Sequence, residues 1–218
     1  METSLKEIYA LGVGHNTPVF IDLAEACGYT ITGLFHYNDE RTGEYDHDIR
    51  IVGSFKDLYC RKSLKGMNFL LTMGDNNIRT EVSNKLISLG GNIPTLIHPS
   101  AIISRFAEIS PIGVYISPFT YVQADSYIGR NTILLSHVNI SHNTHIGDSC
   151  FIAGGATIGA YTTIENSVFI GQGALSISGK VNIIGKGAYI GARALITKNI
   201  PEGAIVKGSP GIITGFLN

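Results

Sequence analysis

Large aliphatic residues recur at every sixth position through the middle of this chain. The series is Ile116, Val122, Ile128, Leu134, Ile140, Ile146, Ile152, Ile158, Ile164 and Ile170. Four places after each stands a small or β-branched residue: Thr120, Ser126, Thr132, Val138, Thr144, Cys150, Ala156, Thr162, Val168 and Ala174. A strict period of six fits neither the 3.6-residue period of a helix nor the two-residue period of a strand. It predicts a parallel β-helix, in which three hexapeptide units close one coil and coils stack about 4.8 Å apart.

The repeat has two breaks. Upstream it continues out of register at Ile97, Ile103 and Ile109, and downstream it resumes at Ile184, Ile190 and Ile196. The downstream break holds the irregular stretch 176–183. Because an added residue in a β-strand forms a bulge or a loop, residues 178–183 have two interpretations: a tolerated insertion, or an irregularity beside a bound ligand.

The first part of the chain lacks the repeat. Residues 1–97 are predicted to form one domain and residues 98–218 the β-helix domain. The expected strands are 8–11, 30–35, 68–73 and 93–97, the expected helices are 18–27 and 78–89, and 36–65 is expected to be mostly loop. Alternating strands and helices favour a parallel sheet. The predicted fold class is α/β plus all-β: a small Rossmann-like domain followed by a left-handed parallel β-helix.

Two loops of the N-terminal domain are candidate ligand sites. Gly12 and Gly14 follow the first strand, where glycines let a phosphate approach the N-terminus of the next helix. Thr17 stands where a dinucleotide fingerprint has its third glycine, so a purely structural turn is an equal alternative. Gly74 follows another strand, and the carboxyl edge of a parallel sheet is where ligands bind.

Composition excludes several classes of function. The 16 basic and 17 acidic residues give a net charge of −1, which argues against nucleic-acid and membrane-surface binding. The three cysteines are scattered, which is typical of a reduced cytosolic protein. The N-terminus is polar and no apolar run is long enough to cross a membrane. We therefore expect a cytoplasmic protein.

His142 is the candidate catalytic residue. It follows the aliphatic Ile140 by two places, so it should project outward, where a histidine can act as a general base near neutral pH. The alternative is a surface or subunit-contact histidine. His137 and His142 have a spacing seen in β-helical carbonic anhydrases, but the third ligand position falls near Ala101. No metal is expected, and a metal-dependent hydratase is kept as an alternative.

The order of these parts resembles the sugar O-/N-acyltransferases, a family typified by sialic acid O-acetyltransferases and the bacillosamine-pathway N-acetyltransferase. The resemblance covers nearly the whole chain. It is carried by residues 12–15, 73–79, 97–101, 142–148, 153–156, 198–201 and 206–210.

The resemblance implies a role for each candidate residue. A nucleotide-linked sugar would bind the N-terminal domain at Gly12, Val13, Gly14, His15, His36, Tyr37 and Gly74. Acetyl-CoA would lie between two β-helices of a homotrimer, at Phe151, Ala160, Gly171, Gly191, Arg193 and Lys198. His142 would be the general base, oriented by Asn143, and the amide near Ala160 would donate to the acetyl oxygen.

The chain departs from the family pattern at four places. Asn143 replaces an acidic residue beside the catalytic histidine, and Phe151 replaces a histidine that contacts the acetyl group. Arg193 replaces a glycine, and His36-Tyr37 replace two acids that hold the nucleotide base. An amide orients an imidazole but does not stabilise an imidazolium as a carboxylate does.

The predicted function is an acetyl-CoA-dependent N-acetyltransferase of a nucleotide-linked amino sugar, in surface polysaccharide or glycan synthesis. A free amine is a good nucleophile, so it tolerates a weak base. Sugar O-acetylation, a longer acyl group, the metal-dependent hydratase and a non-catalytic sugar-nucleotide-binding β-helix are the alternatives.

Overall fold

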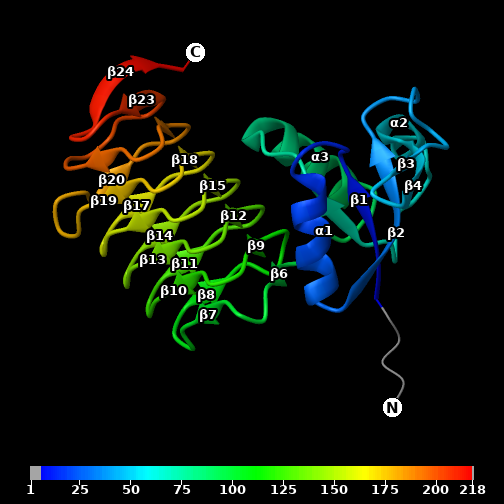
Figure 1. The fold of residues 1–218 in the computed structure, drawn as a ribbon, viewed down its shortest axis with the longest axis horizontal. Helices are drawn as coiled ribbons and strands as arrows, with labels where there is room; N and C mark the ends of the chain where they lie inside the picture. Colours follow the sequence, from blue (N-terminus) through cyan, green and yellow to red (C-terminus); the bar gives the residue numbers. More distant parts are fainter. Residues whose placement is uncertain (1–5, 218) are drawn as a thin grey trace. The chain divides into compact units, whose positions relative to one another are not determined.

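The computed structural model describes residues 6–217; residues 1–5, part of the polar N-terminal stretch, and residue 218 lie outside the described residues. The chain divides into two compact units between Leu96 and Ile97. Figure 1 shows helices in the first unit and a stack of short strands in the second.

The first unit is built on one sheet with strand order β3-β4-β2-β1-β5. Its elements are β1 (Lys6–Leu11), α1 (Thr17–Ala26), β2 (Tyr29–His36), β3 (Tyr45–Asp46), β4 (Ile49–Ser54), α2 (Phe55–Tyr59), β5 (Phe69–Leu71) and α3 (Asn76–Ser88). Strands β1, β2, β4 and β5 pair in parallel, and β3 joins β4 as an antiparallel hairpin. The parallel sheet expected from the sequence is therefore present.

Two local predictions are wrong in this region. Residues 36–65 contain β3, β4 and α2 rather than mostly loop. In strand β4 the one large apolar side chain that is fully buried is Ile51, and helix α2 has only five residues. Neither element therefore gives a long periodic pattern in the sequence. Of the expected strand 93–97 only β6 (Leu96–Ile97) forms, and it pairs within the β-helix, with β9.

The second unit is a parallel β-helix whose two-residue strands stack into three sheets, one per face. The first face holds β7 (Ile102–Ile103), β10 (Tyr121–Val122), β13 (Asn139–Ile140), β16 (Thr157–Ile158), β19 (Leu175–Ser176) and β22 (Leu195–Ile196). The second holds β8 (Glu108–Ile109), β11 (Tyr127–Ile128), β14 (His145–Ile146), β17 (Thr163–Ile164) and β20 (Ile183–Ile184).

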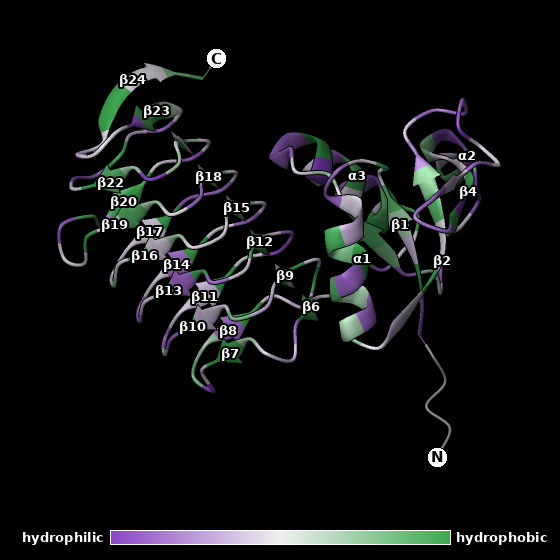
Figure 2. Cartoon of the chain, in the orientation of Figure 1, coloured by the Kyte–Doolittle hydropathy of each residue, from purple (hydrophilic) through white to green (hydrophobic). Residues whose placement is uncertain are grey.

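The third face is the longest. It holds β6, β9 (Tyr115–Ile116), β12 (Ile133–Leu134), β15 (Phe151–Ile152), β18 (Phe169–Ile170), β21 (Tyr189–Ile190), β23 (Ala204–Lys207) and β24 (Ile212–Phe216). From β9 to β23 the neighbouring strands pair in parallel, and β23 and β24 pair antiparallel. Apolar colour follows the stacked strands such as β20 and β22, while the turns between them are paler or hydrophilic (Figure 2).

The six-residue pattern forms the interior of this unit. The aliphatic series from Ile116 to Ile170 is fully buried, and equivalent members lie in register, as Ile140 does with Ile158 one coil on. The small residues of the series Thr120 to Ala174 are at most 3% exposed. Each buried aliphatic side chain contributes about 1.5–3 kcal/mol by leaving water. The predicted β-helix of hexapeptide repeats is confirmed.

The turns at the three edges need left-handed backbone. Positive φ angles recur at 18-residue intervals: Phe119 and His137 on one edge, Asp125, Asn143 and Tyr161 on the next, and Asn131, Ser149 and Ser167 on the third. Such angles strain most side chains, and asparagine and aspartate tolerate them best. These turns set the path of the backbone, and some of their side chains are themselves paired between coils: Nδ2 of Asn131 donates to Oγ of Ser149 at 3.1 Å.

Candidate functional site

The glycine turn after β1 is closed by threonine hydroxyls. The Gly14 amide donates to Oγ1 of Thr17 at 2.9 Å, and this Oγ1 lies 3.1 Å from Oγ1 of Thr72. Thr72 Oγ1 in turn donates toward the carbonyls of Leu11 and Gly12, both 3.0 Å away. Thr17 is 1% exposed and begins α1. Thr17, which stands in place of the third glycine of the dinucleotide fingerprint, therefore links the glycine turn to Thr72 at the end of β5 by hydrogen bonds.

A buried arginine shapes the second loop. Arg79 of α3 is fully buried and donates to the carbonyls of Met73 and Gly74, each at 3.2 Å, and to Oδ1 of Asn76 at 2.7 Å. Asp75 caps the helix by accepting from the amides of Asn77 and Ile78. These hydrogen bonds fix the conformation of the loop from residue 73 to residue 78.

These two loops line one cavity of about 410 Å³. Its lining residues are Gly12, Val13, Gly14, His15, Asn16, Thr17, Tyr37, Phe55, Thr72, Met73, Gly74 and Ile78. Six of the seven predicted substrate-binding residues are among them. His36 is not: it is 6% exposed, and its Nδ1 lies 2.7 Å from Oδ1 of Asn38. Sequence reasoning missed Phe55, which lies on a helix too short to predict.

A second cavity of about 480 Å³ adjoins the first and shares Tyr37, Phe55 and Ile78 with it. Helix α2 places Phe55 there, and α2 begins with a capping box between Ser54 and Asp57. Hydrogen bonds from the amide and hydroxyl of Ser54 lower the pKa of Asp57. Burial, with a smaller contribution from the charge of Glu81, raises the pKa of Tyr59 in this cavity.

His142 lies in the turn between β13 and β14, exposed as its position after Ile140 predicts. Its Nδ1 is 2.8 Å from Oδ1 of Asn143, and the edge-on ring of Tyr161 is 5.2 Å from its own. With the amide oxygen as acceptor, Nδ1 carries the proton and Nε2 keeps its lone pair. The turn thus presents an imidazole able to take a proton.

The residues expected to contact acetyl-CoA fall on three parts of the β-helix. Ala160 and Lys198 share the edge of His142. Gly171, Gly191 and Arg193 follow β18 and β21 and lie on the edge of His137. Phe151 is 7% exposed, on the third face, and stacks on Phe169, which stacks on Tyr189. One chain therefore does not gather these residues at a single place.

The amide of Ala160 is already paired. It donates to Oγ of Ser178, one coil further on, at 2.9 Å. Gly171 has its own steric reason to be glycine, since a Cβ there would lie 2.5 Å from the amide nitrogen of Ala192.

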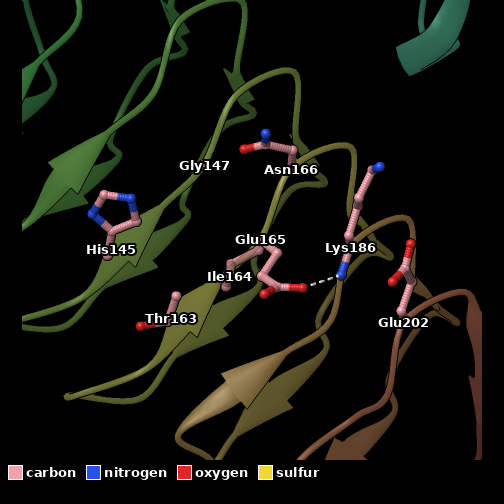
Figure 3. Close-up of a pocket in the computed structure, with 8 residues that line it drawn as sticks. All are labelled: His145, Gly147, Thr163, Ile164, Glu165, Asn166, Lys186 and Glu202. Atoms are coloured by element: carbon pink, nitrogen blue, oxygen red, sulfur yellow. Dashed lines mark hydrogen bonds between the residues drawn. The ribbon is translucent and has the colours of Figure 1, made fainter.

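An open cavity of about 380 Å³ lies on the face of β14, β17 and β20. Its lining includes His145, Glu165, Asn166, Lys186 and Glu202, and Glu165 Oε2 accepts from the Lys186 amide at 2.7 Å (Figure 3). No sequence signal indicated it. Among residues 6–217 no group of three or more His, Cys, Asp or Glu residues is arranged to hold a metal. His137 and His142, the pair behind the metal alternative, lie on different edges.

No helix within the described part of the chain has the length and apolarity needed to span a bilayer.

The parallel β-helix and the hexapeptide repeat together define the class of hexapeptide-repeat proteins. Known proteins of this class are similar to this chain. GDP-perosamine N-acetyltransferase from Escherichia coli is 34% identical over 145 residues, 65% of this chain and 65% of the relative. The acetyltransferase domain of PglB from Neisseria gonorrhoeae, solved with acetyl coenzyme A, is 28% identical with a TM-score of 0.85, and the match covers 96% of this chain and 100% of that one.

The fold extends to a third protein. PerB from Caulobacter crescentus, solved with CoA and GDP-perosamine, has a TM-score of 0.86 at 24% identity and covers 97% of this chain and 99% of its own. A comparison with known protein families finds no match. The homologues of this chain are hexapeptide-repeat sugar acetyltransferases, which confirms the resemblance inferred from the sequence. The matched part of the chain spans less than two thirds of the length of these curated relatives: 65% of the first and about a quarter of two others.

Proposed function

We propose that this protein is an acetyl-CoA-dependent N-acetyltransferase acting on a nucleotide-linked amino sugar. The observation that carries the proposal is the pairing of an exposed His142 with Asn143 on one edge of the β-helix. The relative that is 34% identical is named for this reaction on GDP-perosamine. The N-terminal cavity at Gly12 and Gly74 has the glycine loops that a diphosphate needs.

In the proposed reaction the sugar amine attacks the thioester carbonyl carbon, so that a C–N bond forms and the carbonyl oxygen becomes an oxyanion. Nε2 of His142 takes the amine proton, and Asn143 holds the ring by accepting from Nδ1. The C–S bond then breaks, and the CoA thiolate leaves with the proton from the imidazolium. The products are the acetamido sugar and CoA.

We assign the residues as follows. Gly12, Val13, Gly14, His15, Tyr37 and Gly74 hold the nucleotide-linked sugar in a Rossmann-like domain of residues 1–97, with His36 supporting Tyr37, whose ring centroid is 4.3 Å away. The β-helix domain, residues 98–218, winds left-handed and carries the acyltransferase chemistry. Phe151, Ala160, Gly171, Gly191, Arg193 and Lys198 contact acetyl-CoA.

The distribution of the residues assigned to acetyl-CoA supports a homotrimer. His142 and Arg193 lie on different edges of one prism, and a groove between two prisms brings unlike edges together. We assign the protein to the cytoplasm, where acetyl-CoA and nucleotide sugars are made, and to surface polysaccharide or glycan synthesis. Light scattering that shows a stable monomer would remove the basis for the groove.

The test is product analysis with purified protein and its His142→Ala variant. Both are incubated with acetyl-CoA and a panel of nucleotide-linked amino sugars and neutral sugars, and products are identified by mass spectrometry. Acetylation of an amino sugar by the parent, lost in the variant, is the expected result. Acetylation of a neutral sugar instead would identify an O-acetyltransferase, and nucleotide-sugar binding without any product would favour a binding protein.

A further inference from the structure

Ser178 accepts the hydrogen bond of the main-chain amide that was expected to donate to the acetyl group. The main-chain amide of Ala160 donates to Oγ of Ser178 at 2.9 Å, and Ala160 is only 4% exposed. Both residues lie on the edge of His142, Ala160 one coil and Ser178 two coils further along. For a ligand carbonyl to reach this amide directly, the existing hydrogen bond would have to break.

The neighbouring contacts hold Ser178 in this position. The amide of Gly159 donates to Oγ of Ser176 at 2.9 Å, so two successive amides are capped by two serines of the next coil. A Cβ on Gly159 would lie 2.5 Å from the amide nitrogen of Ser178, so the coils approach here because residue 159 is glycine. The close approach and the two caps together fix the hydroxyl above Ala160.

The two serines differ in what they present to solvent. Ser176 is 2% exposed, whereas Ser178 is exposed at the edge, where the chain leaves the repeat through Gly179. A serine hydroxyl that accepts one hydrogen bond still has a hydrogen to donate. Accepting from an amide polarises that hydroxyl and strengthens its own donation.

We propose that the Ser178 hydroxyl, oriented by the Ala160 amide, is the donor that this protein offers to the carbonyl oxygen of the acetyl thioester. Its hydrogen bond would strengthen as that oxygen gains negative charge during attack by the amine. The inference rests on the proposed function and revises one part of it: the Ala160 amide acts through Ser178 instead of touching the acetyl group. The irregular stretch 178–183 is then part of the site.

The experiment reads the carbonyl directly. Acetyl-CoA labelled with ¹³C at the carbonyl is bound to the purified protein, and the isotope-difference infrared spectrum gives its stretching frequency. A hydrogen bond to the oxygen lowers this frequency below that of free acetyl-CoA. We expect the lowered frequency in the parent and in Ser178→Thr, which keeps the hydroxyl, and a return toward the free value in Ser178→Ala.

Ser176→Ala is the matched control, because it removes the same kind of amide cap from a buried position. It should keep the lowered frequency. With an amino-sugar acceptor, Ser178→Ala should lower kcat about 100-fold, as the loss of one oxyanion donor does, while KM for acetyl-CoA changes little.

The outcomes separate the two proposals. If Ser178→Ala binds acetyl-CoA with the parent's carbonyl frequency and keeps its kcat, the Ser178 hydroxyl is not the donor, and the inference is overturned while the proposed function stands. If the parent protein binds no acetyl-CoA in the infrared sample, the proposed function fails, and the inference fails with it.

Discussion

Nδ1 of His142 lies 2.8 Å from the side-chain oxygen of Asn143, the next residue in the same exposed turn. Asn143 has a φ angle of +54°, a left-handed conformation that asparagine tolerates better than most residues. The amide holds the imidazole in one tautomer and brings no charge to it. The site therefore orients its base without the negative charge by which a carboxylate would stabilise an imidazolium.

Replacing this amide by a carboxylate should speed the reaction. Asn143→Asp keeps a residue type that tolerates positive φ and places a negative charge beside the imidazolium that forms during proton transfer. An exposed ion pair contributes about 0.2–1 kcal/mol, so we expect kcat/KM for the amino sugar to rise up to about fivefold. Asn143→Gly, which removes the side chain without backbone strain, should lower it. If steady-state kinetics give the Asn143→Gly variant the same kcat/KM as the parent, this role of Asn143 is contradicted.

The threonine that closes the glycine turn should matter for folding and for ligand binding. Thr17→Val removes a hydroxyl that accepts from the Gly14 amide and donates to the Gly12 carbonyl, and the net loss of an intramolecular hydrogen bond costs about 0.5–1.5 kcal/mol. We expect that loss in urea denaturation, and weaker nucleotide-sugar binding in titration calorimetry. Thr17→Ser retains the hydroxyl and is expected to behave like the parent. Equal stability of the valine and serine variants would show that the turn does not depend on this bond.

Close coil stacking predicts a stability defect at one glycine. In Gly171→Ala the new Cβ would lie 2.5 Å from the amide nitrogen of Ala192, which is backbone and cannot rotate away. Overpacking of this kind costs about 1–3 kcal/mol. Gly14→Ala is the matched control, because nothing lies within 4 Å of its added Cβ. A thermal unfolding midpoint lowered in Gly171→Ala alone is the expected result, and equal midpoints would argue against tight packing at this edge.

The α2 cap should make stability depend on acid pH. The pKa of Asp57 lies below its ordinary value of 3.8 because Ser54 donates hydrogen bonds to the carboxylate. A carboxyl whose pKa is lower in the folded state than in the unfolded state stabilises the protein at pH values above the unfolded-state pKa. This stabilisation is lost as the pH falls through the folded-state pKa. Asp57→Asn should therefore lower the unfolding midpoint at pH 7, and the difference from the parent should shrink below about pH 3.8. A difference independent of pH would assign the effect to something other than charge.

The repeat is what made the β-helix predictable. A buried aliphatic residue at every sixth position, as at Ile140 and Ile146, leaves one way to place all of them inside. No comparable regularity marks residues 36–65, where Ser54 and Asp57 start a helix of only five residues. Short elements depend on a single cap and on their neighbours in space, which a sequence pattern does not record.

Only part of the geometry of the candidate site could be predicted in this way. The position of His142 in the repeat specifies an exposed side chain, and the glycine loops specify a cavity. The bond from Ala160 to Ser178 depends on the path of a stretch that leaves the repeat, so the period could not reveal it. The cavity beside His145 combines ordinary surface residues from several coils, and only stacking brings them together.

Because each coil repeats the one before it, every edge position has an equivalent one strand spacing away. Ala124 and Ala160 are the equivalents of His142 in the adjacent coils. The side chains at positions 124 and 160 therefore lie about 4.8 Å on either side of position 142 along the same edge, so a substitution at either position alters the surroundings of the imidazole from a fixed distance.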